Sequence, residues 1–276
     1  ARPTAPVASL SYTSLGEYER CGYRFYLERV LGLPGVERPA PGSGGAQEEA
    51  AAGISAADRG VLVHALLETL DFRRGRAPSV EEATAAAARV GVRATAAEVE
   101  EAVGLVGRFL ESGVPKRLAA AAEVRREEPF GFLLEPTGVV VGGFLDVLAR
   151  EGRRMLVVDY KSDRLAGADP ANVVAQEYAI QRLVYALAAL KGGAEEVEVL
   201  HTFLELPERP VSAAYVRADA QALERELSGL ADGVLRREFT VSPAPHRALC
   251  YGCPGEGGSC SWPLELTRRE RVDTLF

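Results

Sequence analysis

The stretch from residue 139 to residue 161 reads VVVGGFLDVLAREGRRMLVVDYK. Its two apolar halves, 139–149 and 154–161, are rich in valine and leucine, which is typical of buried β-strands. The polar segment between them contains a glycine and suits a hairpin turn. The stretch therefore predicts two neighbouring strands of one sheet, joined by a short turn.

The segments that flank this hairpin predict the rest of the sheet. One further strand is expected before it, and two strands and two helices after it. The expected elements are a strand at 123–135, a helix from Asp169 to about Leu190, strands at 196–206 and 211–216, and a helix at 219–237. Strands interleaved with a long helix predict a mixed α/β sheet flanked by helices.

The first 120 residues are predicted to be helical apart from one loop. Thr13 or Ser14 can cap a helix that runs to about Val30. The segment 35–57 is rich in glycine, alanine and proline and predicts a mobile loop. Further helices are expected at 58–72 and, two or three in number, across 79–120.

We expect one integrated domain with three segments. They are an N-terminal helical part at 1–121, a core at 122–240 and a cysteine-containing segment at 241–276. A chain of 276 residues, 47% of them hydrophobic, is long enough to bury a sizeable core.

Composition and charge exclude several classes of protein. No apolar run approaches the ~18 to 20 residues that a membrane-spanning helix needs, and no apolar signal core opens the chain. The net charge of −7 is not that of a strongly basic nucleic-acid-binding protein. The one methionine is Met155. We therefore expect an excised or processed piece of a longer cytoplasmic protein with no membrane partner.

The end of the second predicted strand can carry chemistry. Successive side chains of a strand point to opposite faces, so Asp159 and Lys161 should project together while Val158 and Tyr160 face the other way. Asp146 lies 13 residues before Asp159, on the neighbouring strand. Two carboxylates and an ammonium group could together hold Mg²⁺ or Mn²⁺ beside a phosphate. From these residues alone, a salt bridge at a strand end is an equally good interpretation.

Five motifs along the chain resemble those of the RecB-type nuclease domains of the PD-(D/E)XK superfamily. In order, they are Arg59-Gly-Val-Leu-Val-His64, Glu128-Pro-Phe, Gly-Phe-Leu-Asp146, Asp159-Tyr160-Lys161 and Gln181-x-x-x-Tyr185. The resemblance covers nearly the full chain, and it depends on the order of the motifs because each alone is common. It implies a restriction-endonuclease-like fold, with a mixed β-sheet core flanked by helices and an N-terminal helical subdomain.

The resemblance also implies a role for each motif residue. The implied metal ligands are His64, Asp146, Asp159 and the Tyr160 carbonyl; the implied catalytic residues are Asp146, Asp159, Lys161, Gln181 and Tyr185, with Glu128 in support. Some of these assignments have a plain structural alternative. His64 could be a core residue of an apolar helix. Gln181 and Tyr185 share a helical face and could simply support the sheet.

The cysteines indicate a second metal site. Three of the four lie in Cys250-Tyr-Gly-Cys253-Pro-Gly-Glu-Gly-Gly-Ser-Cys260, and the fourth is Cys21. From spacing alone, four thiolates favour structural zinc. A subset of RecB-type nucleases carries one N-terminal and three C-terminal cysteines around a [4Fe–4S] cluster, so the resemblance favours iron–sulfur, with Zn²⁺ as the alternative. Gly22 departs from that subset, in which proline usually follows the first cysteine, and the last spacing is slightly long.

The sequence therefore predicts a metal-dependent DNA nuclease domain, in the first place an exonuclease, of a helicase–nuclease in double-strand break repair or recombination. The sequence Asp159-Tyr-Lys-Ser-Asp163 resembles that of the C-terminal nuclease domains of UvrD/Rep-type helicases in AddAB-like complexes. Since the chain has no P-loop motif, the expected partners are DNA and a helicase motor in the same chain or in a partner subunit. Two alternatives stay open. One is an inactive nuclease-fold module that binds DNA or a partner, and the other is a zinc-stapled interaction domain.

Overall fold

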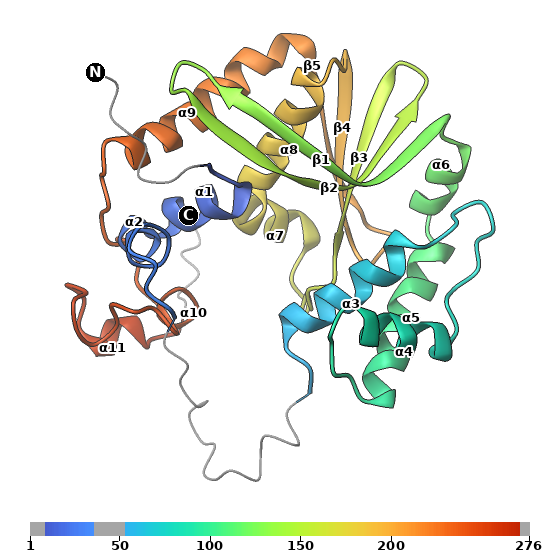
Figure 1. Ribbon diagram of the computed structural model, residues 1–276, viewed down its shortest axis with the longest axis horizontal. Helices are drawn as coiled ribbons and strands as arrows, with labels where there is room; N and C mark the ends of the chain where they lie inside the picture. The colour runs from blue at the N-terminus through green and yellow to red at the C-terminus, as the bar shows by residue number, and fades with distance from the viewer. Residues whose placement is uncertain (1–8, 36–52, 271–276) are drawn as a thin grey trace. The chain divides into compact units, whose positions relative to one another are not determined.

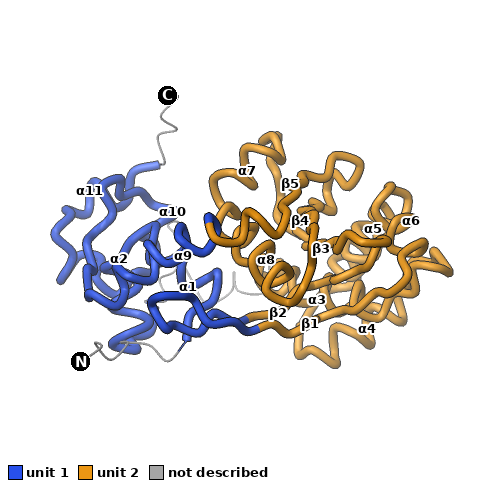
Figure 2. Tube along the Cα trace, turned by 90° about the horizontal axis from the view of Figure 1, so that it is seen from above, with its two compact units in different colours: residues 1–45, 131–142, 222–276 blue, residues 46–130, 143–221 orange. Residues whose placement is uncertain are grey.

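The computed structural model describes residues 9–35 and 53–270, which form two compact units (Figure 2). Unit 1 takes residues 9–35, 131–142 and 222–270, and unit 2 takes residues 53–130 and 143–221. Unit 1 therefore draws on both ends of the chain. Most of the loop predicted at 35–57 lies outside the described residues.

The helices and strands follow one another as labelled in Figure 1. The helical elements before the sheet are α1 (Tyr12–Arg20), α2 (Gly22–Phe25), the π-helical turn η1 (Tyr26–Val30), α3 (Ala56–Glu68), α4 (Val80–Arg89), α5 (Ala96–Glu111) and α6 (Val114–Ala120). The strands are β1 (Glu123–Leu134), β2 (Val139–Glu151), β3 (Arg154–Lys161), β4 (Glu196–Phe203) and β5 (Val211–Val216). The remaining helical elements are α7 (Pro170–Glu177), α8 (Ala179–Lys191), the short turn η2 (Arg217–Asp219), α9 (Ala220–Leu235), α10 (Arg247–Cys250) and α11 (Leu264–Thr267). No helix within these described ranges is long and apolar enough to cross a membrane.

The strands form one mixed sheet in the order β1-β2-β3-β4-β5. β2 and β3 are antiparallel, as are β4 and β5. β3 and β4 are parallel, with Asp159 opposite His201. A parallel pair needs a crossover connection, and here α7 and α8 supply it, with α8 in contact with both strands (Figure 1). The mixed α/β sheet predicted from the sequence is confirmed.

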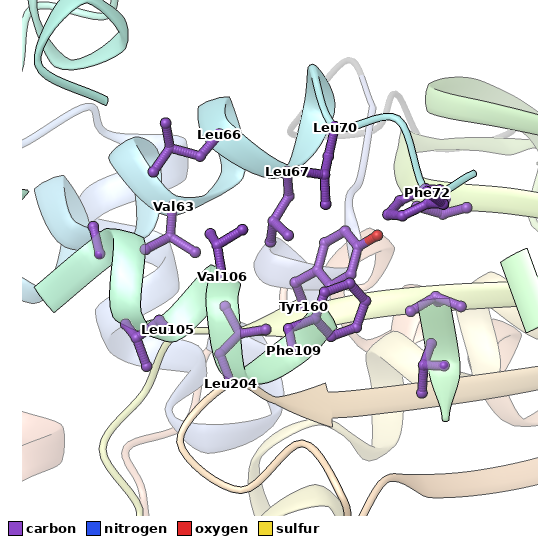
Figure 3. Close-up of a cluster of buried hydrophobic side chains, with 14 of the residues drawn as sticks. Val63, Leu66, Leu67, Leu70, Phe72, Leu105, Val106, Phe109, Tyr160 and Leu204 are labelled. Carbon is purple, nitrogen blue, oxygen red and sulfur yellow. The ribbon is translucent and has the colours of Figure 1, made fainter. Parts of the chain in front are cut away.

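Helices α3 to α6 pack on one face of this sheet in unit 2. α5 begins with a capping box in which the Thr95 and Glu98 side chains satisfy each other's backbone N–H groups. The apolar faces of these helices bury aliphatic and aromatic side chains against β2, β3 and β4. In Figure 3 the Tyr160 ring of β3 lies beside Phe109 of α5, with the ring centroids 5.2 Å apart. The helical subdomain thus supports β3 on the face that carries its even-numbered residues.

β3 divides its side chains between two environments. Val158 and Tyr160 belong to the apolar cluster under the helical subdomain. Asp159 and Lys161 contact Gln181 of α8 on the opposite face. The predicted alternation is confirmed. Because β3 is covered on both faces, its polar side chains are almost fully withdrawn from water, with Asp159 2% and Lys161 8% exposed.

Unit 1 begins with a helix that Ser11 caps. The Ser11 hydroxyl accepts a hydrogen bond from the Ser14 N–H at 3.1 Å, and the Ser14 hydroxyl accepts one from the Ser11 N–H at 2.7 Å. The prediction that Thr13 or Ser14 is the cap is therefore wrong. The predicted single helix is also interrupted, because Cys21 is extended (φ −160°, ψ 100°) and separates α1 from α2.

The two ends of the chain pack together within unit 1. The rings of Tyr18, Phe25 and Tyr26 lie against the ring of Phe239. The Tyr18 hydroxyl donates a hydrogen bond to the Glu238 carbonyl oxygen at 2.9 Å. Segments more than 200 residues apart in the sequence are thereby joined by ordinary packing.

The long helix predicted from Asp169 to about Leu190 is in fact two helices. Asp169 caps the first, α7, through its side chain. Tyr178 then leaves the helical region (φ −121°, ψ 10°) and separates α7 from α8. No glycine or proline marks this position, so helical periodicity does not reveal the break. The break matters because it sets the direction of the Tyr178 ring.

Candidate active site

The side-chain amide of Gln181 links the polar residues on the α8 face of the sheet. Its Oε1 accepts a hydrogen bond from the Lys161 ammonium at 2.8 Å, and its Nε2 donates to Asp159 Oδ1 at 2.7 Å. Nε2 also donates to the hydroxyl of Tyr185, one turn along α8, at 2.9 Å. All four side chains are buried. A primary amide is both donor and acceptor, so Gln181 satisfies groups that water does not reach.

Lys161 is held from three directions. Besides Gln181, its ammonium pairs with Asp159 Oδ2 at 2.8 Å. It also lies 3.9 Å from the centre of the Tyr178 ring, which is a cation–π distance. The Tyr178 hydroxyl donates a hydrogen bond to Asp163 Oδ2 at 2.9 Å, which fixes the ring. These contacts set the position of the ammonium at the carboxyl end of β3.

His201 is a buried residue of this site that the sequence analysis did not select. Its ring stacks on Tyr178, with centroids 6.0 Å apart, and it lies opposite Asp159 in the register of β3 and β4. Within the described part of the chain neither ring nitrogen has a hydrogen-bond partner. Burial lowers the pKa of His201 to about 4, so the ring is neutral near pH 7 and packs as an aromatic group. Its place next to Asp159 depends on strand register, which the sequence did not reveal.

Three possible ligand atoms converge beside the Tyr160 peptide group. They belong to His64 of α3, Glu127 of β1 and Asp146 of β2, and all lie within 4.8 Å of one another. The Tyr160 N–H donates to Asp146 Oδ2 at 2.8 Å, and the Tyr160 carbonyl oxygen is 3.2 Å from His64 Nε2. In the neutral tautomer whose Nε2–H donates to that carbonyl, the lone pair of His64 Nδ1 is available to bind a cation.

The carboxyl groups of this cluster hold protons unusually tightly. Burial, and after it the negative charge of Asp159, raises the pKa of Asp146 to about 7. Burial also raises the pKa of Glu127. Crowded, desolvated carboxylates favour protonation because too little positive charge offsets theirs. One imidazole and two carboxylates are a donor set that fits Mn²⁺ or Mg²⁺, and such an ion would supply that positive charge.

Glu127 of the cluster is the neighbour of Glu128, the glutamate that the sequence analysis selected. The Glu128 carboxylate pairs with Arg125 and does not enter the cluster. Glu127 has φ 45°, a left-handed conformation that is uncommon for residues other than glycine. Such a residue interrupts the alternation of a strand, so strand spacing does not tell which of the two neighbouring glutamates enters the cluster. The only signal in the sequence is that two glutamates stand side by side. The supporting role that the resemblance implies for Glu128 stays a prediction.

Asp159 lies beside this cluster, with its two oxygens engaged by Gln181 and Lys161. The structure thus sorts the residues selected from the sequence into two adjoining groups. The first group contains His64, Asp146 and the Tyr160 peptide, together with Glu127; the second contains Asp159, Lys161, Gln181 and Tyr185.

The four cysteines come together in unit 1. All are free thiols and line one small pocket, together with Leu249 and Trp262 among others. Burial raises the pKa of Cys250, and the negative charge that the other three thiolates would carry raises it further. Across residues 9–35 and 53–270, no three of the four sulfur atoms lie within 4.8 Å of one another.

Gly22 follows Cys21 at the position where the resemblance expects proline. The Tyr23 N–H donates to the Thr240 carbonyl oxygen at 2.9 Å, so the two backbones run close together. A Cβ atom added to Gly22 would lie 3.2 Å from the backbone nitrogen and oxygen of Thr240. Glycine therefore suits this close approach of the two chain ends.

A mixed sheet that presents Asp146, Asp159 and Lys161 from adjacent strands has the architecture expected of the restriction-endonuclease-like class. The family model of the PD-(D/E)XK nuclease superfamily matches residues 9–257. The chain belongs to this superfamily and is a nuclease domain, which confirms the family and the fold class predicted from the sequence.

Curated relatives are similar to parts of the chain. An ATP-dependent helicase/nuclease subunit of Bacillus cereus (strain ATCC 10987 / NRS 248) is 27% identical over 158 residues, which cover 50% of this chain and 13% of that protein. The protein of the same name from Desulfitobacterium hafniense (strain DSM 10664 / DCB-2) is 40% identical over 93 residues, covering 31% of this chain and 7% of that protein. The matched stretches are thus a small fraction of each relative. A solved structure from Eubacterium rectale aligns with 84% of this chain and 82% of its own at 11% identity, with a TM-score of 0.45.

Proposed function

We propose that the chain is the metal-dependent DNA nuclease domain, an exonuclease, of a helicase–nuclease that acts in double-strand break repair or recombination. The observation that carries the proposal is the convergence of His64, Glu127 and Asp146 beside the hydrogen-bonded Asp159 and Lys161. The relatives named helicase/nuclease subunits support DNA as the substrate and a helicase motor, in the same chain or a partner subunit, as the partner.

In the proposed mechanism His64, Glu127 and Asp146 would hold Mg²⁺ or Mn²⁺ with Asp159 beside them. The Tyr160 carbonyl oxygen, 3.2 Å from His64 Nε2, would orient the imidazole instead of binding the ion. A bound ion would supply a water of lowered pKa and would offset charge on the phosphate. The Tyr160 peptide orients Asp146 and His64 through its N–H and carbonyl groups. These contacts place the donors before any ion arrives.

In the proposed mechanism Lys161 is the protein side chain that brings positive charge to the phosphate. Its ammonium stabilises the negative charge that develops on the phosphate oxygens during cleavage. Gln181 and Tyr178 keep the ammonium in place, so little reorganisation is needed when the substrate binds. Asp159 and Gln181 act together with Lys161 because one hydrogen-bonded network joins all three.

The test is incubation of the purified chain with linear single- and double-stranded DNA. We expect degradation that requires Mg²⁺ or Mn²⁺ and stops when EDTA is added. An exonuclease should spare a circular single strand of the same sequence, which therefore serves as the control. Intact linear DNA in the presence of metal would contradict the proposed activity, and rapid cutting of the circle would contradict the exonuclease assignment.

The affinity of the site for Mn²⁺ is expected to fall as the pH drops below about 7. Burial and Asp159 raise the pKa of Asp146 to about 7, and the carboxyl must lose its proton before it binds metal. The proton released by Asp146 means a loss of about tenfold in affinity per pH unit below that pKa. Protonation of Glu127, whose pKa burial also raises, would make the loss steeper. Calorimetric titration with Mn²⁺ between about pH 5.5 and 8 measures it.

The matched control for this pH dependence is Asp159→Asn, which removes the second cause of the raised pKa. The pH at which Mn²⁺ affinity begins to fall is expected to be lower in this variant than in the unaltered chain, because one charge that repels the Asp146 carboxylate is gone. A Mn²⁺ affinity that stays constant across this pH range in the unaltered chain would contradict the assignment of Asp146.

We propose that Cys21, Cys250, Cys253 and Cys260 hold a [4Fe–4S] cluster, with structural Zn²⁺ as the alternative. A zinc ion with Zn–S distances of about 2.3 Å keeps all its sulfur ligands within about 4.6 Å of one another. The four sulfurs of the described chain are spread more widely than that. What supports a shared metal centre is that all four free cysteines line one pocket, and the resemblance favours a cluster over zinc.

A further inference from the structure

Two arginines in unit 2 share one carboxylate close to the proposed catalytic residues. Arg59 Nη2 lies 3.4 Å from Glu101 Oε1, and Arg164 Nη2 lies 3.2 Å from the same oxygen. Arg59 belongs to α3, Glu101 to α5, and Arg164 follows β3. Two guanidinium groups thus share a single carboxylate oxygen, with Asp58 and Asp163 next to them in the chain.

The position of this arginine pair follows from how α3 passes the end of β3. His64 of α3 lies by Tyr160, with Nε2 3.2 Å from the Tyr160 carbonyl oxygen. Gly60 lies one helical turn before His64 and packs close to Ser162, since a Cβ atom added to Gly60 would lie 3.5 Å from the Ser162 hydroxyl. Four residues of helix rise about 6 Å, and two residues of strand about 6.6 Å. The region around Gly60 and Ser162 therefore lies about 6 to 7 Å from the metal cluster. This distance is comparable to that between successive phosphates of a DNA strand.

The pairing with Glu101 leaves the arginines incompletely satisfied. The Arg59 side chain is only 12% exposed, and its Nε has no hydrogen-bond partner among the described residues. Glu101 and Arg164 are 41% and 69% exposed, and exposed ion pairs contribute little stability. A phosphodiester offers the guanidinium groups a charge-assisted acceptor of the same kind, which can replace such a weakly held carboxylate.

We propose that Arg59, Arg164 and the Ser162 hydroxyl form a binding subsite for the DNA backbone phosphate next to the one cleaved, and that Glu101 occupies this subsite until DNA binds. The subsite rests on the proposed nuclease function. The subsite would let a chain with a net charge of −7 engage a polyanion, because both guanidinium groups become available to a phosphate when Glu101 is displaced. Arg59 lies on α3, which also carries His64, and Arg164 follows β3 three residues after Lys161, so binding this phosphate would align the strand with the metal cluster.

The experiment measures the affinity of the 276-residue chain for a short single-stranded DNA across a range of salt concentrations, in EDTA. Arg59→Ala and Arg164→Ala should each weaken binding about tenfold, the value of one charge-assisted contact. Each should also lower the slope of log affinity against log salt by about 0.7, since one phosphate contact is lost. Glu101→Gln should do the opposite and tighten binding several-fold, because the internal competitor is neutralised.

Two controls separate a phosphate subsite from general charge effects. Glu195→Gln removes an exposed carboxylate, 57% exposed and paired with Arg217, that precedes β4 and lies at the opposite end of the parallel β3–β4 pair. It should change the affinity little. The gain from Glu101→Gln should also disappear when Arg59 and Arg164 are both alanine, which a double-mutant cycle measures.

The outcomes distinguish this inference from the proposed function. If the unaltered chain cleaves linear DNA with Mn²⁺ but the arginine and Glu101 variants bind DNA with unchanged affinity and salt slope, the subsite is wrong and the nuclease function stands. If the unaltered chain neither binds nor cleaves DNA, both are wrong. A tighter Glu101→Gln variant whose gain survives removal of both arginines also overturns the subsite.

Discussion

Replacing Lys161 with alanine, or Asp159 with asparagine, is expected to slow metal-dependent DNA cleavage at least about a hundredfold. A hundredfold loss corresponds to about 2.7 kcal/mol of barrier, which is typical for one group that stabilises developing charge. The structure gives the reason, since the Lys161 ammonium is fixed by Asp159 Oδ2 and Gln181 Oε1, each at 2.8 Å. Initial rates on linear DNA in Mn²⁺ measure the effect.

The single variants also affect stability, and the design must separate this from catalysis. Each leaves one buried charge without its partner, which costs about 3 to 5 kcal/mol. The double variant Asp159→Asn/Lys161→Met removes both charges, so it should regain much of the thermal stability while remaining inactive. Lys116→Ala, on the exposed surface of α6, is the matched lysine control and should retain full activity. Activity in either single variant equal to that of the unaltered chain would refute the site.

The second large effect is expected from Cys21→Ser, which should remove most of the metal from the cysteine site. Structural metal sites contribute on the order of 10 kcal/mol to the folding of small domains, and they fail as a unit when a ligand is lost. The segment around Cys250 and Cys260 should then become sensitive to protease. It should loosen rather than detach, because Tyr23 still donates to the Ser259 carbonyl and Trp262 to the Ser242 carbonyl.

The measurements are metal content, visible absorbance and limited proteolysis of residues 250–262. Iron with visible charge-transfer absorbance in the unaltered chain would favour the cluster, and zinc without colour would favour the alternative. Ser261→Ala, an exposed neighbour of Cys260, is the control and should keep the metal. If Cys21→Ser keeps both its metal and its protease resistance, Cys21 is not a ligand.

The parts of the fold that could be predicted are those that follow a simple period. The apolar runs of β2 and β3 gave the hairpin, and alternation along β3 placed Asp159 and Lys161 on one face and Tyr160 on the other. Gln181 and Tyr185, four residues apart, do share a helical face and a hydrogen bond. These relations depend only on local geometry, which the residue spacing determines.

The parts that could not be predicted depend on departures from a period or on contacts between distant segments. Glu127 enters the cluster through one left-handed residue in β1, and Tyr178 reaches Lys161 through a helix break without glycine or proline. His201 is placed by the parallel register of β3 and β4. Tertiary packing decides the positions of these three side chains. Periodic patterns in the sequence are therefore less reliable close to the site.

Tyr160 connects two parts of this protein. Its ring is anchored against Phe109 of the helical subdomain, while its own N–H and carbonyl groups hold Asp146 and His64. A protein engineer who exchanged α4 to α6 for another helical insert would therefore also shift the donors of the metal cluster. Grafting this nuclease centre onto a new scaffold therefore requires the helices that pack against the Tyr160 face of β3, as well as the residues of the site.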